Sequence, residues 1–208
     1  MSDELIFYTN PMSRGRIARW MLEEVGAPYR TEILDYGTSM KAPEYLAINP
    51  MGKVPAIRHG EVVVTECAAV IAYLADAFPE AGLKPGLKDR GSYYRWLFFG
   101  AGPIEAAMIN RSLGFEVPKD KEATAGYGNY EMVRDTLEQA VSGDGYLAGD
   151  AFSAVDVYIG AQIAFGLQFK SIEQRPAFVS YVARLSKREA YQRAAALDDA
   201  AMPDQSTS

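Results

Sequence analysis

The residues whose types and spacing could do chemistry lie in two short stretches, 49–57 and 65–71. Pro55 follows Val54 between a turn and an apolar run typical of a strand, where a residue that cannot donate to a sheet ladder is unusual. A cis bond before Pro55 would turn a main-chain N–H and C=O outward. If a helix begins near Glu66, this free edge lies beside a positive helix end, which suits a small peptide with a carboxylate. The alternative is a proline in an ordinary turn.

The first 78 residues must supply the elements that position these stretches. Their hydrophobic pattern predicts strands at 5–8, 29–34, 56–58 and 62–64, helices at 13–25 and 66–78, and one helical turn within 43–47. Gly26 and Pro28 predict the end of the first helix. The resulting order, β-α-β-α-β-β-α, is that of a thioredoxin-like domain.

The rest of the chain shows no strand alternation. Two prolines and two glycines within residues 79–86 predict a linker. The periodicity beyond it predicts helices near 87–112, 120–142, 154–168, 175–186 and 188–197. Gly and Pro at 100–103 predict an interruption of the first of these. Residues 198–208 are predicted to be a frayed polar tail.

Two motifs in the right order make this chain resemble the glutathione transferase family. The run Asn-Pro-Met-Gly-Lys-Val-Pro-Ala-Ile at 49–57, with Glu66-Cys67 after it, resembles that family's cis-proline loop and its Glu/Gln-Ser pair. Residues 146–156 resemble its helical-domain motif. The resemblance implies the glutathione transferase fold, with a thioredoxin-like domain at 1–78, a linker at 79–86 and an all-helical domain at 87–208.

The resemblance further implies an enzyme that activates the thiol of glutathione, as co-substrate, for attack on a small hydrophobic electrophile. A free thiol has a pKa of about 8.5, so a donor aimed at the sulfur would favour its thiolate. Ser13 is the first candidate donor, as in serine-type bacterial, theta-like or beta-like members, and Tyr8 is its rival. The alternative for Ser13 is a helix cap. The alternative for Tyr8 is a core residue with its hydroxyl at the rim.

Three neighbours of these residues are further candidates. Thr9 and Asn10 could also donate to the sulfur, and Arg14 could supply positive charge to a thiolate.

The resemblance also implies the ligand contacts of the second stretch. The N–H groups at 66–68 would hold the γ-glutamyl carboxylate, and Glu66 would take the α-ammonium. The alternative for Glu66 is a plain first-turn acid. Cys67 departs from the family pattern, because S–H is a weaker donor than a hydroxyl. The alternatives for Cys67 are a mixed disulfide with glutathione or a small buried residue.

The first stretch is expected to hold the rest of the tripeptide. Val54, beside Pro55, would offer main-chain hydrogen bonds to the cysteinyl part. Lys53 is the first candidate for the glycyl carboxylate, and Lys41 is the second.

The second domain is expected to supply the acceptor side. Met12 and an aromatic residue such as Phe99 would face the electrophile, and Glu105 would contact glutathione bound to the partner subunit of a homodimer. Ser153 and Asp156 have the spacing of a capping box, which we assign to folding.

Composition excludes several other functions. The net charge of −6 disfavours nucleic-acid binding, and no apolar run of 18 residues is present to span a membrane. One cysteine and one histidine, His59, predict neither a metal site nor a Cys-His hydrolase. The lone cysteine and the acidic N-terminus predict a cytosolic protein. Two alternatives to a transferase stay open: a binding or stress-response module with little catalysis, and a glutathione-dependent peroxide or disulfide reductase.

Overall fold

The computed structural model describes residues 4–203 and divides them into two compact units. Unit 1 takes the described residues up to Ala81 together with those from Arg188 onward, and unit 2 is Gly82–Lys187. The helical domain was predicted to extend from residue 87 to the end of the chain. The structure instead groups the last helix with the first unit.

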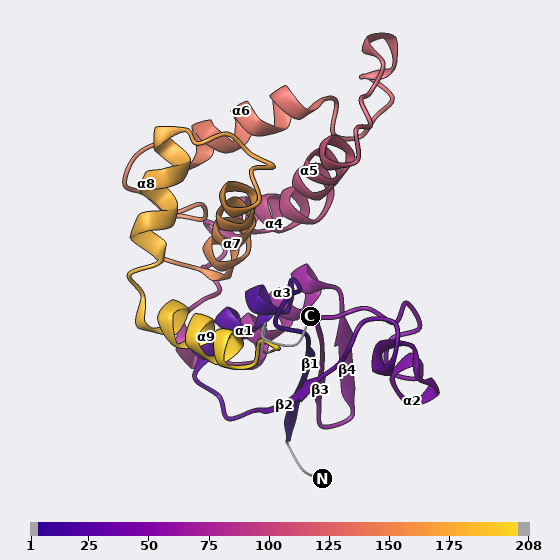
Figure 1. Cartoon of the computed structure of the whole chain (residues 1–208). Coiled ribbons are helices and arrows are strands. Elements are labelled where there is room, and N and C mark those ends of the chain that lie inside the picture. The colour runs from indigo at the N-terminus through magenta and orange to yellow at the C-terminus, as the bar shows by residue number, and fades with distance from the viewer. Residues whose placement is uncertain (1–3, 204–208) are drawn as a thin grey trace. The chain divides into compact units, whose positions relative to one another are not determined.

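Unit 1 is built on a mixed sheet (Figure 1). Within the described residues it has four strands in the order β2-β1-β3-β4: β1 (Leu5–Thr9), β2 (Arg30–Ile33), β3 (Ala56–His59) and β4 (Val62–Thr65). β1 and β2 are parallel, whereas β3 pairs antiparallel with both β1 and β4. All four strands were predicted.

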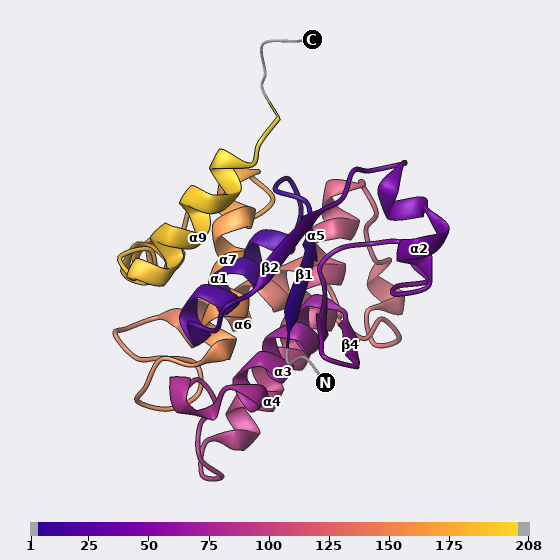
Figure 2. The ribbon, with the colours of Figure 1, turned by 90° about the horizontal axis from the view of Figure 1, so that it is seen from below.

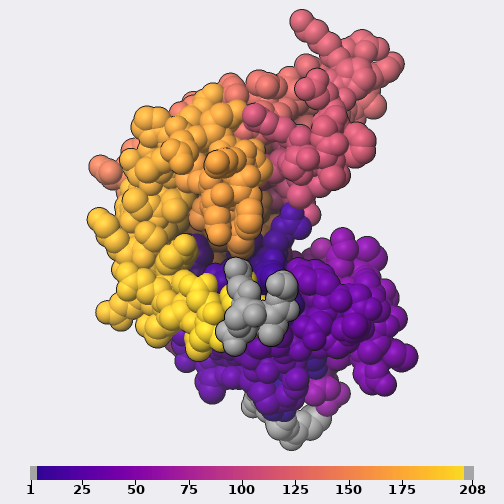
Figure 3. Space-filling model, viewed as in Figure 1, coloured from indigo at the N-terminus to yellow at the C-terminus, as the bar shows by residue number. Residues whose placement is uncertain are grey.

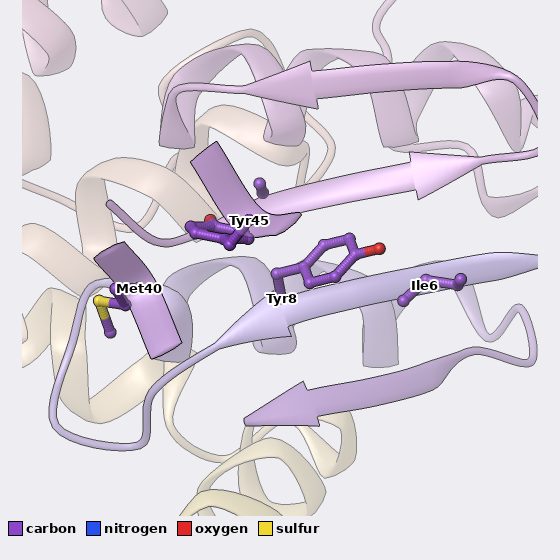
Figure 4. Packing of buried hydrophobic residues seen from close by; sticks show 5 residues of the cluster. Ile6, Tyr8, Met40 and Tyr45 are labelled. Atoms are coloured by element: carbon purple, nitrogen blue, oxygen red, sulfur yellow. The ribbon is translucent and has the colours of Figure 1, made fainter. Parts of the chain in front are cut away.

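Helices cover both faces of this sheet. They are α1 (Gly15–Val25), α2 (Pro43–Leu46), α3 (Cys67–Ala77) and α9 (Glu189–Ala200), with single 3₁₀ turns η1 (Ser39–Lys41) and η2 (Pro79–Ala81). Side chains alternate along β1, so Ile6 and Tyr8 pack toward α2 and form one cluster with Met40 and Tyr45 (Figure 4). Helix α1 ends where Gly26 adopts a left-handed φ of 68°, as predicted.

The last helix corrects the predicted frayed tail. Helix α9 continues to Ala200 and lies alongside α1 in both ribbon views (Figure 1, Figure 2). In the space-filling view its atoms lie directly against the rest of unit 1 (Figure 3). Asp198 is fully buried and accepts a hydrogen bond of 2.7 Å from Arg19. This buried ion pair and the packing of α9 along α1 make the segment part of unit 1. Residues 204–208 lie outside the described part.

The regular elements of unit 2 are all helical within the described residues. Its elements are α4 (Arg90–Phe99), the π-helical turn η3 (Gly100–Ile104), α5 (Glu105–Ser112), η4 (Lys119–Lys121), α6 (Tyr130–Val141), α7 (Ala154–Gln168) and α8 (Pro176–Leu185). The predicted interruption at 100–103 is confirmed as η3, where Pro103 has no N–H to donate.

The helix predicted at 120–142 begins later than expected. Residues 113–129 form turns that project from the body of unit 2 (Figure 1), and α6 starts only after Asn129, whose side chain accepts from the Met132 N–H at 2.8 Å. Gly128, with a φ of 70°, sits just before this cap. Gly128 and the N-cap residue Asn129 favour a helix start at this point. The charged sequence before them does not indicate that the helix starts so late.

Asp156 organises the start of α7, as predicted. Its carboxylate is fully buried and accepts hydrogen bonds from the Ser153 N–H at 2.9 Å, the Leu147 N–H at 3.0 Å and the Tyr181 hydroxyl at 2.7 Å. The capping box with Ser153 is confirmed. Among residues 4–203 no helix is both long and apolar enough to cross a bilayer.

Candidate functional site

The strand register gathers the predicted site residues at one end of the sheet. Tyr8 pairs with Ala56, and Ala56 pairs with Thr65, which gives one row across β1, β3 and β4. The loop that follows β1, the Val54–Pro55 segment before β3 and the start of α3 after β4 therefore meet at this end. These three segments are separated in the sequence and are brought together by the pairing of the strands.

The main chain at Val54 is free at this end. The bond between Val54 and Pro55 is cis, as predicted. Neither the N–H nor the C=O of Val54 finds a hydrogen-bond partner within residues 4–203. Buried or half-buried main-chain groups are almost always paired, so a free pair on a half-buried residue is available to a bound molecule.

The N-terminus of α3 lies at the same end of the sheet as this edge. Glu66 is the N-cap residue, and its side chain makes no capping hydrogen bond. The positive N-terminal end of a helix favours a bound carboxylate. Glu66 also has a left-handed φ of 68°, a conformation that costs a residue with a side chain about 1–3 kcal/mol and occurs often at ligand sites. Its own carboxylate is exposed.

The loop after β1 is held by Asn10, which the sequence had indicated only as a possible donor. Asn10 is buried, its Nδ2 donates to the Leu34 carbonyl at 2.8 Å, and its Oδ1 accepts from the Met12 N–H at 2.9 Å. Its main-chain carbonyl accepts from both the N–H and the hydroxyl of Ser13, at 3.0 and 2.7 Å. These four bonds fix the loop that carries Ser13.

Ser13 makes a local turn just before α1, whose N-cap residue is Arg14. The Ser13 Oγ accepts from the Gly15 N–H at 2.9 Å, and its hydroxyl donates to the Asn10 carbonyl. α1 begins at Gly15, two residues later than predicted, because this local bond holds residue 13 outside the helix. Ser13 remains half-exposed at the site end of the sheet.

The Tyr8 side chain lies in the core of unit 1, unlike the half-exposed Ser13. It is only 8% exposed and packs against Tyr45 with 5.6 Å between ring centroids. Figure 4 shows its hydroxyl pointing back along β1 toward Ile6, away from the loop that follows the strand. This direction favours the core alternative for Tyr8.

Thr9 and Gly15 make the closest approach in this region. A Cβ on Gly15 would lie 1.9 Å from the Thr9 Oγ1, so only glycine fits there. Thr9 is fully buried, and its hydroxyl has no partner among the described residues.

Cys67 links the start of α3 to the start of α1. Its thiol is directed at the Arg14 carbonyl, with 4.0 Å between Sγ and the oxygen. The side chain is half-buried and Arg14 is exposed. Cys67 therefore lies within the candidate site, at the start of α3.

The lysines have different surroundings. Lys53 is exposed beside Val54. Lys41 donates from Nζ to the carbonyls of Met51 and Gly52, at 3.1 and 2.9 Å, so its ammonium already supports the loop before β3.

Two residues that sequence reasoning missed also support this loop. Tyr45 and Asn49 both donate to the Lys53 carbonyl. Asn49 is part of the motif at 49–57, but nothing in that motif indicates which atom its side chain reaches.

The residues expected on the acceptor side fall in different units. Met12 belongs to unit 1 and is 57% exposed. Phe99 and Glu105 belong to unit 2, where Phe99 packs edge-on against Trp96 at 5.2 Å and Glu105 starts α5. In the described residues, no group of three His, Cys, Asp or Glu side chains could hold a metal ion.

Known proteins to which this chain is similar include glutathione S-transferases. A model of the glutathione S-transferase N-terminal domain matches residues 12–77. The chain is 29% identical to a probable glutathione S-transferase of Oryza sativa over 157 residues, which covers 70% of this chain and 73% of that relative. A solved glutathione transferase of Methylococcus capsulatus is similar with a TM-score of 0.77 and 27% identity, over 94% of this chain and 99% of that one. The chain is thus similar to glutathione S-transferases over most of its length.

A second solved structure supports the predicted fold. A glutathione transferase homologue from Sulfitobacter, with bound glutathione, is similar with a TM-score of 0.75 and 24% identity, over 97% of this chain and 100% of that one. The glutathione S-transferase fold predicted from the sequence is therefore confirmed. Residues 12–77 contain most of the site residues described above, from the β1–α1 loop to the start of α3.

Proposed function

We propose that this protein is a glutathione transferase, which binds glutathione on unit 1 and activates its thiol for attack on an electrophile. The observation that carries the proposal is the free main chain of Val54 at the same end of the sheet as the N-terminus of α3, which the Glu66 side chain does not cap. An extended peptide can pair with the main chain of Val54, and its carboxylate can bind at the N-terminus of α3. The relatives named as glutathione S-transferases support the same function.

In this proposal the tripeptide lies extended between the two features. Three extended residues span about 10 Å. The cysteinyl part pairs with Val54 beside the cis Pro55, and the γ-glutamyl carboxylate meets the first turn of α3. Glu66 takes the ammonium as a charge-assisted pair, and Lys53 takes the glycyl carboxylate.

We propose Ser13 as the donor to the sulfur, which makes the protein a serine-type member. Its proton is held by the Asn10 carbonyl, but that carbonyl also accepts the Ser13 N–H. The hydroxyl can therefore turn to a thiolate and leave no carbonyl unpaired. A hydrogen bond to a charged thiolate is stronger than one to a neutral carbonyl. The Ser13 hydroxyl therefore stabilises the thiolate and lowers the pKa of the glutathione thiol.

The remaining expectations stay part of the proposal. The acceptor is a small apolar electrophile. The protein is a cytosolic homodimer in which Glu105 contacts glutathione on the partner subunit.

Two assays and one titration test the proposal. Retention on immobilised glutathione together with conjugation of a generic aryl halide supports a transferase. Retention without turnover supports a binding module, and turnover of hydroperoxides or disulfides alone supports a reductase. Calorimetry that gives no heat with reduced glutathione at millimolar concentration overturns glutathione binding altogether.

A further inference from the structure

The carbonyl of Lys53 is held by two buried side chains of unit 1. The Tyr45 hydroxyl donates to it at 2.6 Å and the Asn49 amide donates to it at 2.8 Å. Tyr45 is 3% exposed and Asn49 is 4% exposed. Asn49 is itself oriented by the Met51 N–H, which donates to its Oδ1 at 3.1 Å.

This double hydrogen bond determines where the next N–H points. The bond between Lys53 and Val54 is trans, since Val54–Pro55 is the cis bond recorded for the described chain. In a planar trans peptide the C=O and the N–H point in opposite directions. With the Lys53 oxygen turned toward Tyr45 and Asn49, the Val54 N–H must point away from them, where it has no partner within residues 4–203.

We infer that Tyr45 and Asn49 are positioning residues for glutathione: by holding the Lys53 carbonyl, they aim the Val54 N–H at the cysteinyl carbonyl of the bound tripeptide. This inference rests on the proposed function. Neither side chain touches the ligand, and both act through the peptide plane between Lys53 and Val54.

The neighbouring loop supports this role. Lys41 holds the carbonyls of Met51 and Gly52, so three successive carbonyls, 51 to 53, accept from side chains of η1, α2 and the segment after it. A Cβ on Gly52 would lie 2.6 Å from the Met40 oxygen, and its φ is 56°, so the loop has little room to move. A preorganised main chain loses less entropy when a ligand binds.

The Tyr45 hydroxyl does more than complete the core. Its ring packs with Tyr8 in the apolar cluster, which a phenylalanine ring would serve equally well (Figure 4). Burial raises the pKa of Tyr45 to about 12, so the hydroxyl keeps its proton, and remains a donor, throughout the pH range of an assay.

The test is Tyr45→Phe, which removes the hydroxyl and keeps the ring. We expect kcat/KM for glutathione to fall about three- to tenfold, the effect of one neutral hydrogen bond, through a higher KM, with kcat at saturating glutathione within about twofold. Asn49→Ser, whose shorter side chain cannot reach the carbonyl, should give the same pattern. Tyr29→Phe is the matched control, because the Tyr29 hydroxyl donates to Glu23 in the same unit but does not contact the Lys53 carbonyl. It should leave KM unchanged.

A shortened thiol separates positioning from a structural effect. γ-Glutamylcysteamine lacks the cysteinyl carbonyl, so Tyr45→Phe should lower kcat/KM for glutathione but leave that for γ-glutamylcysteamine unchanged. Equal losses with both thiols, or a loss in kcat alone, overturn the inference while the proposed function stands. A wild-type protein that neither binds nor conjugates glutathione overturns the proposed function, and this inference with it.

Discussion

The Ser13 hydroxyl donates to the main-chain carbonyl of Asn10 at 2.7 Å, in the loop between β1 and α1. The same hydroxyl accepts from the Gly15 N–H at 2.9 Å. Ser13 thus supports the Gly15 N–H at the start of α1, although the N-cap residue is Arg14. This support is compatible with the proposed role as sulfur donor, because the oxygen accepts from Gly15 while the hydroxyl proton can change its acceptor.

Replacing Ser13 with Ala should lower turnover at pH 7 about 10- to 100-fold, the effect of one hydrogen bond to a charged group. Steady-state conjugation across the pH range checks this. The deficit should shrink above about pH 8.5, where the free thiol ionises without help. Ser13→Thr, which keeps a hydroxyl, should retain most of the activity, and Tyr8→Phe should change it little. A deficit of the same size at all pH values, or a larger effect of Tyr8→Phe, would assign the donor elsewhere.

Replacing Cys67 with Ser should tighten glutathione binding several-fold. A hydroxyl donates more strongly than a thiol to the γ-glutamyl carboxylate expected at the first turn of α3. Calorimetric titration of the variant with reduced glutathione measures the change, with Cys67→Ala as the control that has no donor. Binding of the Ser variant no tighter than wild type would remove this residue from the proposed ligand contacts.

Replacing Asp156 with Ala should lower stability without a specific loss of catalysis. The change leaves buried donors of Leu147, Ser153 and Tyr181 without an acceptor, at about 1–3 kcal/mol each. The melting temperature and the soluble yield should both fall. Asp150→Ala, at an exposed position of the same segment, should change neither. Reduced activity at an unchanged melting temperature would contradict the folding role.

Replacing Glu173 with Gln should reduce stability in a pH-dependent way. Burial disfavours the charged form of Glu173, but hydrogen bonds from Tyr130 and Arg111, at 2.6 and 2.8 Å, outweigh it and lower the pKa to about 2. Because the pKa of Glu173 is lower in the folded state, its ionised carboxylate stabilises the fold at pH values above the unfolded-state pKa of about 4.5. This stabilisation is lost as the pH falls toward 2.

Denaturant unfolding at a series of pH values checks this sign. The wild type should exceed Glu173→Gln in stability at pH 7, and the difference should narrow between about pH 4.5 and pH 2. Glu116→Gln, at an exposed loop position, serves as the control. A difference that does not change with pH would show that ionisation of Glu173 contributes nothing.

Local patterns in the sequence determined most of the element order. Hydrophobic periodicity located β1 and α1, and glycine and proline located the end of α1 and the interruption at η3, because these residues act on the backbone where they stand. The pairing of Pro55 with a nearby helix start likewise indicated the site end, since both features lie close together in the sequence.

Only the tertiary structure decided which side chains meet. Asp198 bonds Arg19 across 179 positions of sequence, and this contact makes α9 part of unit 1. The Tyr8 hydroxyl points away from the site and the Tyr45 hydroxyl reaches the carbonyl before Val54, although both are tyrosines in one apolar cluster. Such outcomes depend on packing among distant elements, which leaves no local periodicity or motif in the sequence.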